Sequence, residues 1–295
     1  MLQRFLDPLV LAQVARLDLI AKTVVDGFVA GLHRSPDFGF SQEFAEYRSY
    51  TPGDDLRHVD WSVYARSERL YLKRYRGETN SQLSVLVDAS NSMSFASGKL
   101  SKIDYARFAA ASLFYLANAQ RDAAGLVVFD DEVRNYVPPS TRQGQFHRLL
   151  HGIEQAEPRL RTNYSKPFQH LMEFLRRRGV VVVFSDFYEE PETVIRSIEP
   201  LRFRGNDVVL FHVLDPRELD PKIKDPVILV DLETQDSLEV TPDYAQREYR
   251  SKITAHCEAL RQKAKGAGMD YYLMATDKPL DGALHEYLSI RLGRL

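Results

Sequence analysis

The stretch Leu83–Ser94 reads Leu-Ser-Val-Leu-Val-Asp-Ala-Ser-Asn-Ser-Met-Ser. Its first five residues are mostly apolar and β-branched, which is typical of a strand buried on both faces of a sheet. Three oxygen-bearing side chains follow at alternate positions, namely Asp88, Ser90 and Ser92. Ligands of open α/β sheets bind at the carboxyl ends of the strands, and hard oxygen donors suit magnesium or manganese better than zinc or copper. The sequence therefore predicts a divalent-metal site at this turn.

Predicted strands and helices alternate after this stretch. Apolar runs at 124–129, 180–184 and 208–214 predict buried strands, and a short strand is expected at 134–137. Helices are expected at 104–118, 146–153, 167–175, 194–201, 244–265 and 283–290, with a last strand at 271–274. This alternation predicts an α/β fold with a doubly wound, mainly parallel sheet flanked by helices.

The chain divides into an N-terminal part and a main domain. Residues 1–80 contain predicted helices and then an arm rich in charges and aromatics, which we expect to pack on the main domain through its aromatics. Residues 81–295 form the predicted α/β domain. Within it, the polar segment 215–241 is expected to carry a small β-hairpin insertion, with strands at 227–231 and 237–240.

Composition narrows the classes of function. The chain has 295 residues, of which 44% are hydrophobic and 27% charged, and its formal net charge is -2. That charge gives no reason to expect nucleic acid or a membrane surface as a partner. A single cysteine, Cys257, excludes an internal disulfide and suits a reducing compartment. Because no apolar run is long enough to cross a bilayer, we expect a cytoplasmic protein that does not itself span a membrane.

Two further residues are candidates for the metal site. Asp186 follows the most apolar predicted strand, and Thr162 lies in a polar loop before a helix. Loops after neighbouring parallel strands converge at one edge of the sheet, so these side chains are expected to meet the Asp88 turn. The candidate ligands of Mg²⁺ or Mn²⁺ are therefore Asp88, Ser90, Ser92, Thr162 and Asp186.

Each candidate also has a purely structural interpretation. Asp88 and the two serines could form a polar turn that caps a helix. The loop around Thr162 could cap the following helix through Asn163 or Ser165. Asp186 could be a strand-end carboxylate that accepts hydrogen bonds from backbone amides. These alternatives stay open at the level of sequence.

The combination of Asp-x-Ser-x-Ser, a threonine before a helix and an aspartate after the central strand resembles the metal-ion-dependent adhesion site of von Willebrand factor type A domains. The arm resembles the bacterial domain-of-unknown-function family fifty-eight, whose members are von Willebrand A-like, and the likeness runs from about Gly31 to Asp186. The arm motif reads Arg48-x-Tyr50-x-Pro52-Gly53-Asp54-Asp55-x-Arg57-x-x-Asp60-Trp61, followed by Ala65-Arg66 and Glu78.

The resemblance implies a function. In such domains the serines and the threonine hold magnesium directly or through water, and the aspartates bind or orient that water. The ion keeps an open position for an Asp or Glu of a partner protein. Members are often encoded beside AAA-type ATPases of the MoxR group, which makes such an ATPase a possible partner in protein assembly or maturation. Many relatives have membrane-spanning helices before the arm. No such helix is expected in this chain, so the resemblance does not imply that this protein is tethered to a membrane.

Two other functions compete with a metal-dependent interaction module. An aspartate at the end of a first strand could accept a phosphoryl group in a magnesium-dependent phosphohydrolase. However, dehalogenase-type phosphatases need a second aspartate two positions later, where this chain has Ser90. The protein could also be a structural partner whose metal site stays empty. Chelator-insensitive binding to a partner would favour that last hypothesis.

Overall fold

The structure is a computed structural model that describes residues 8–11, 16–32, 44–49, 63–64, 71–75, 82–159, 164–175, 178–231 and 236–293. The strands are β1 Phe44–Ser49, β2 Tyr71–Tyr75, β3 Gln82–Asp88, β4 Ala123–Phe129, β5 Val133–Ser140, β6 Val180–Ser185, β7 Asp207–Leu214, β8 Val227–Val230, β9 Ser237–Val240 and β10 Asp270–Ala275. The helices are α1 Pro8–Leu11, α2 Leu17–Leu32, α4 Lys102–Ala119, α5 Gln145–Glu154, α6 Ser165–Phe174, α7 Pro191–Phe203, α8 Pro216–Leu219, α9 Pro242–Tyr244, α10 Arg250–Gly266 and α11 Asp281–Gly293, with a 3-10 helix at Asn91–Ser94 and a π-helical turn at Ala245–Tyr249.

The predicted mainly parallel sheet is confirmed. Six strands pair in the order β10-β7-β6-β3-β4-β5, and all neighbours are parallel except β4 and β5. The edge strand β5 is longer than the expected 134–137 and includes Pro138 and Pro139. Prolines are tolerated there because an outer strand need not donate every ladder hydrogen bond. Strand β3 lies at the centre, so its carboxyl end is enclosed on both sides.

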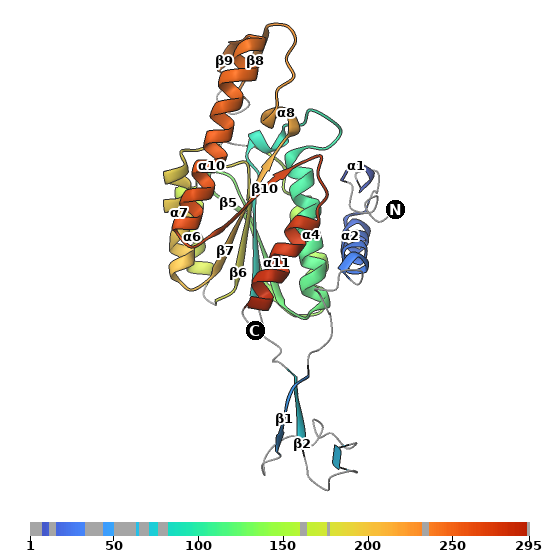
Figure 1. The fold of residues 1–295 in the computed structure, drawn as a ribbon. Helices are drawn as coiled ribbons and strands as arrows, with labels where there is room; N and C mark the ends of the chain where they lie inside the picture. Colours follow the sequence, from blue (N-terminus) through green and yellow to red (C-terminus); the bar gives the residue numbers. More distant parts are fainter. Residues whose placement is uncertain are drawn as a thin grey trace.

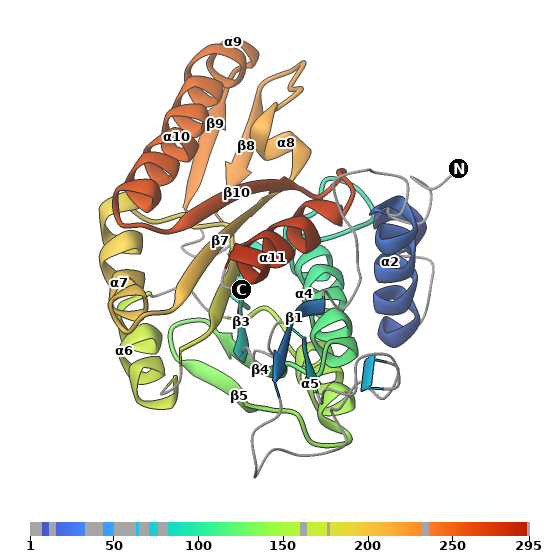
Figure 2. The same ribbon diagram turned by 60° about the horizontal axis from the view of Figure 1, so that its bottom comes forward.

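Two layers of helices cover the sheet (Figures 1 and 2). One apolar core joins Leu83, Val85 and Val87 of β3 to α4, α5 and α11. The other joins Leu86 of β3 to α6, α7 and α10. Alternate residues of a strand point to opposite faces, so the continuous apolar run of β3 serves both cores. Helix α2 lies outside α4, and its apolar side chains belong to the first core (Figure 1).

The N-terminal arm contains a β-ribbon of two strands, of which β1 was not predicted from the sequence. Strands β1 and β2 pair antiparallel with each other in a separate sheet. In Figure 1 this ribbon lies below the edge where β3 starts, whereas α8 and the β8–β9 hairpin lie at the opposite edge. The expected packing of the arm's aromatics concerns side chains outside the described residues, as does nearly all of the arm motif.

The expected hairpin insertion is present as the antiparallel pair β8–β9. Its apolar side chains are largely exposed, with Ile228 at 69% and Leu238 at 57% exposure. No helix within the described ranges is both long enough and apolar enough to span a membrane. Cys257 lies buried in α10, in a small cluster with Leu214 and Ile253.

Candidate metal centre

The carboxyl end of β3 places three predicted ligands in one turn. The Asp88 side chain is completely buried, at 0% exposure, and its Oδ1 accepts a 2.8 Å hydrogen bond from the backbone N–H of Ser90. The hydroxyl oxygens of Ser90 and Ser92 are 3.0 Å apart. Ser90 precedes the 3-10 helix, yet its hydroxyl makes no capping hydrogen bond. The two hydroxyls therefore face each other instead of capping the helix.

The neighbouring strand β6 brings the fifth predicted ligand to the same place. Val87 pairs with Phe184, so the next residues along each strand, Asp88 and Ser185, are adjacent. The Ser185 hydroxyl donates to Oδ2 of Asp88 over 2.5 Å, and Asp186, which follows Ser185, is also buried. Burial and the nearby charge of Asp186 raise the pKa of Asp88 to about 7, although its hydrogen bonds favour the ionised form.

Thr162 lies outside the described residues, but the chain on both sides of residues 160–163 contacts the Asp88 turn. On one side, the backbone N–H of Arg159 donates to the Ala89 carbonyl over 3.1 Å. On the other, the Tyr164 hydroxyl lies 2.6 Å from the Ser185 hydroxyl and 3.5 Å from Oδ2 of Asp88. The two residues that flank residues 160–163 thus both contact this turn or its neighbour Ser185.

A buried lysine that sequence reasoning missed lies beside Asp186. Lys102 is the first residue of α4, and its side chain is 0% exposed. Its ammonium donates to Oδ2 of Asp186 and to Oε1 of Glu218, each over 2.8 Å. Burial opposes the ammonium charge, but the two carboxylates outweigh burial and raise the pKa of Lys102. Among the described residues, the Asp186 carboxylate binds an ammonium, and no backbone amide donates to it as the structural interpretation required.

Glu218 is held by the end of the neighbouring strand β7. Asp215 follows this strand and caps α8, where its Oδ1 accepts from the N–H of Arg217 over 2.8 Å. Its own backbone N–H donates to Oε2 of Glu218 over 2.8 Å, which completes a capping box. Oδ2 of Asp215 accepts from the N–H of Ser97, in the loop after β3. These bonds join the ends of β3, β6 and β7 around the Lys102 ammonium.

The donor set fits a hard divalent cation. Two buried carboxylates lie close enough to repel each other, and a cation between them would relieve that repulsion. The carboxylate and hydroxyl oxygens are the ligands that magnesium and manganese prefer. Within the described ranges, no three His, Cys, Asp or Glu side chains are grouped to hold a metal. Hydroxyls would therefore have to complete the ligand set, with Asp88, Ser90, Ser92 and Asp186 as its described members.

Another strand-end aspartate shows how a purely structural carboxylate differs. Asp130 follows β4 and is buried, and both of its oxygens lie 2.7 Å from Nε of Arg134. Although burial opposes it, this hydrogen bonding lowers the pKa of Asp130. Asp130 thus has an ordinary ion-pair partner, whereas the pKa of Asp88 is raised. This contrast makes Asp130 a suitable control position.

A buried histidine lies on β7 next to the site. The Nδ1 atom of His212 is 2.7 Å from the Tyr271 hydroxyl, and Nε2 is buried with no hydrogen-bond partner among the described residues. Burial lowers the pKa of His212 to about 3. The imidazole is therefore neutral near pH 7 and adds no positive charge to the site.

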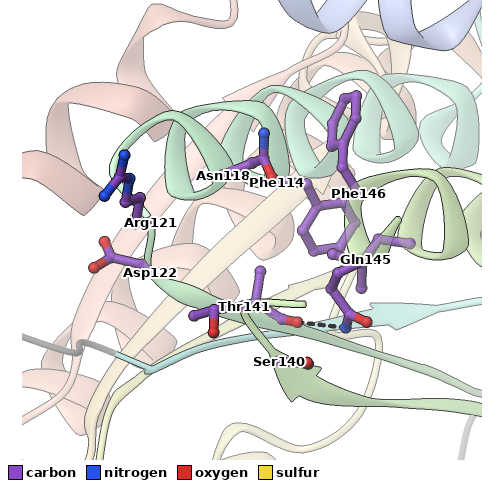
Figure 3. A pocket seen from close by; sticks show the side chains of 10 residues that line it. Phe114, Asn118, Arg121, Asp122, Ser140, Thr141, Gln145 and Phe146 are labelled. Atoms are coloured by element: carbon purple, nitrogen blue, oxygen red, sulfur yellow. Dashed lines mark hydrogen bonds between the residues drawn. The ribbon is translucent and has the colours of Figure 1, made fainter. Parts of the chain in front are cut away.

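A separate cavity of about 390 Å³ lies at the other end of the sheet (Figure 3). It is bounded by the end of α4, the start of β4 and the start of α5, with Arg121, Asp122 and Phe146 among its lining residues. Ala124 lies five positions before Phe129 at the other end of β4, which corresponds to roughly 16 Å. The cavity is therefore no part of the candidate metal centre.

Comparison with known proteins places this arrangement in a family. Residues 46–263 match the family model described as "Protein of unknown function DUF58". The chain belongs to this family. The family assignment confirms the resemblance to domain-of-unknown-function family fifty-eight, and the matched residues include all five candidate ligands.

Other known proteins are similar to this chain in sequence or in fold. An uncharacterized protein of Mycobacterium tuberculosis is 29% identical over 277 residues, which cover 92% of this DUF58 chain and 86% of the relative. The crystal structure of BatB from Bacteroides thetaiotaomicron has a TM-score of 0.50 at 13% identity, covering 72% of this chain and 97% of that chain. The SpRpn10 VWA domain is also similar, with a TM-score of 0.42 at 12% identity, covering 70% and 94%. At this identity the likeness to BatB is one of fold, and it agrees with the mainly parallel sheet flanked by helices.

The sequence analysis missed three contacts of the site. One of them has a signal in the sequence, and the other two have none. The capping box of α8 could be read from Asp215-Pro-Arg-Glu218, because an acidic residue three positions after a capping residue is its signature. Nothing local indicates that Glu218 meets Lys102, which is 116 positions away. The contact of Tyr164 with Ser185 likewise depends on how α6 packs beside β6.

Proposed function

We propose that this DUF58 protein is a metal-dependent protein-interaction module. Its site binds Mg²⁺ or Mn²⁺ through Asp88, Ser90, Ser92, Thr162 and Asp186, and the bound ion accepts an Asp or Glu carboxylate from a partner protein. The observation that carries the proposal is the pairing of two buried carboxylates, Asp88 and Asp186, beside two hydroxyls that face each other. The contacts of Arg159 and Tyr164 with the Asp88 turn support the inclusion of Thr162.

Docking follows from the charge and coordination of such an ion. Magnesium requires octahedral oxygen coordination and usually keeps several waters, because it gives them up reluctantly. One of these waters can be replaced by an external carboxylate, which forms a charge-assisted contact. Ser185 and Tyr164 hold Asp88 in place, and Lys102 holds Asp186. The protein's own residues thus orient both carboxylates before the partner arrives.

The surroundings of Asp88 do not favour a phosphohydrolase. A phosphoryl acceptor must offer an oxygen to an incoming phosphate. Asp88 is fully buried, and its two oxygens accept from the Ser90 N–H and the Ser185 hydroxyl. The position two residues later is Ser90, so no aspartate stands there as acid or base. We therefore propose no enzymatic step.

Isothermal titration with MgCl₂ and MnCl₂ tests the metal site. The intact protein is expected to bind one ion, and Asp88→Ala is expected to weaken binding by far more than tenfold, because even supporting residues of metal sites contribute about 10- to 100-fold. Asp130→Asn serves as the matched control, since it changes a buried strand-end aspartate outside the site. The proposal fails if the intact protein binds neither ion, or if Asp88→Ala binds as tightly as the intact protein.

A pulldown tests the docking step. We propose an AAA-type ATPase of the MoxR group as the partner, on the strength of the family resemblance, with a role in protein assembly or maturation. The purified ATPase is expected to be retained by the protein in about 5 mM MgCl₂, which is enough to saturate a weak divalent-cation site, and to be released by EDTA. Retention that survives EDTA and Asp88→Ala would favour a structural partner with an empty site.

A further inference from the structure

Lys102 occupies a position that ordinary helix chemistry does not favour. It is the first residue of α4, where the positive end of the helix dipole repels a cation. It is also 0% exposed, and lysine is almost never fully buried unless its charge is paired. Lys102 therefore does not stabilise the start of α4. Its side chain is held by the groups that surround its ammonium.

Those groups belong to the candidate metal centre. The ammonium contacts Asp186, a proposed ligand, and Glu218, which is not one. It also lies 4.9 Å from the centre of the Tyr188 ring. The two carboxylates that share this ammonium, Asp186 and Glu218, carry one more formal negative charge than it balances. A divalent ion would balance that excess, but it would have to share Asp186 with Lys102.

We propose that the Lys102 ammonium is an internal counter-cation that lowers the affinity of the site for divalent metal, and that Glu218 limits this effect by drawing the ammonium away from Asp186. The inference rests on the proposed function and adds a control of affinity to it. Lys102 acts here as a positioning residue, because it reaches the metal only through Asp186.

Charge repulsion sets the direction of the effect. An ammonium on one oxygen of Asp186 repels a dication that approaches the same carboxylate, and the repulsion is strong because both side chains are buried. Removing the ammonium leaves Asp186 and Glu218 without their counter-charge, which further favours a bound dication. Removing the charge of Glu218 instead leaves the ammonium to Asp186 alone. The two substitutions therefore act in opposite directions.

Titration of MnCl₂ into the full chain and three variants tests the inference. Lys102→Met is expected to bind Mn²⁺ at least about tenfold more tightly than the unchanged protein, and Glu218→Gln at least about threefold more weakly, as expected for one unit of charge near a dication. Lys263→Met is the matched control, because it removes a lysine from the surface ion pair with Glu192 and should leave the affinity unchanged. A purely structural ion pair would weaken binding, or leave it unchanged, in both site variants.

The outcomes separate this inference from the proposed function. If Lys102→Met is folded by circular dichroism and binds Mn²⁺ no more tightly than the unchanged protein, the inference is overturned and the proposed function stands. If Lys102→Met does not fold, Lys102→Gln takes its place, because it also removes the charge but keeps a polar side chain beside both carboxylates, and affinity no tighter than that of the unchanged protein overturns the inference. If neither the unchanged protein nor Lys102→Met binds Mn²⁺, both proposals fail.

Discussion

The Ser185 hydroxyl donates to Oδ2 of Asp88 over 2.5 Å, and this bond joins the ends of two adjacent central strands. The same hydroxyl oxygen accepts from the N–H of Phe187 over 3.0 Å, so one serine organises both sides of the β6 turn. Both groups are buried. The bond therefore contributes to stability and also fixes the carboxylate that we propose as a metal ligand.

Ser185→Ala is expected to destabilise the protein by about 1.5–3 kcal/mol at pH 8, where Asp88 is ionised, because hydrogen bonds to charged groups contribute that much. Urea unfolding followed by circular dichroism measures this loss. Ser197→Ala is the control, since Ser197 lies half-buried on α7 and its hydroxyl donates to the Thr193 carbonyl in a solvent-exposed hydrogen bond. It should change the free energy of unfolding by less than about 0.5 kcal/mol. Equal losses in the two variants would contradict the role of Ser185.

The raised pKa of Asp88 predicts how stability depends on pH in metal-free protein. The folded-state pKa is about 7, against a model-peptide value of 3.8, so the folded state binds the proton more tightly. The contribution of Asp88 is therefore fully present below pH 4 and is lost as the pH rises through 7. Relative to Asp88→Asn, the unchanged protein should lose on the order of 4 kcal/mol between these limits.

Urea unfolding in EDTA across that pH range checks this prediction. The difference between the protein and Asp88→Asn is the quantity to use, because His212 has a lowered pKa and changes stability in the opposite direction. Asp130→Asn provides the control. The pKa of Asp130 is lowered, so its difference curve should be flat between pH 4 and 7. A flat curve for Asp88→Asn as well would show that Asp88 is ionised throughout.

Metal binding should weaken as the pH falls through the same region. A carboxylate must lose its proton to bind a cation, so proton and metal compete for Asp88. Below its pKa of about 7, the affinity for Mn²⁺ is expected to fall by about tenfold for each pH unit. Titration calorimetry at pH 8, 7 and 6 measures the change. An affinity that stays constant down to pH 6 would mean that Asp88 is not a ligand.

Gly179, which directly precedes β6, should tolerate no side chain. A Cβ atom at Gly179 would lie 2.2 Å from the backbone oxygen of Gln82, at the start of β3. Gly179→Ala must therefore push two central strands apart, and we expect a loss of about 1–3 kcal/mol in the free energy of unfolding. Gly98→Ala is the control, because nothing lies within 4 Å of the added atom. Thermal unfolding distinguishes the two variants.

The sheet could be predicted from sequence because its strands are decided locally. Continuous apolar runs mark the central strands β3, β6 and β7, and each coincides with its predicted range to within one residue. Strand β1 was missed because its residues are mixed charged and aromatic, and only pairing with β2 defines it. The antiparallel direction of β5 was likewise not predicted, since no local pattern encodes it.

The sequence predicted the residues at the ends of the strands, but not the residues from other elements that contact them. Asp88 and Asp186 meet as expected, because strand ends in a parallel sheet converge. Lys102 was not predicted, because it lies outside the expected helix 104–118 and nothing in the sequence indicates that Glu218 of α8 lies beside it. The metal itself and the part played by Thr162 stay predictions.

The position of Cys257 has a practical consequence for experiments with labelled protein. The only thiol of the chain lies beneath the surface of α10, and burial raises its pKa, so little reactive thiolate forms near pH 7. A cysteine introduced at an exposed position such as Ser94, beside the Asp88 turn, would react with a maleimide dye far faster than Cys257. Fluorescence or spin probes could therefore be attached at the rim in an otherwise unaltered sequence.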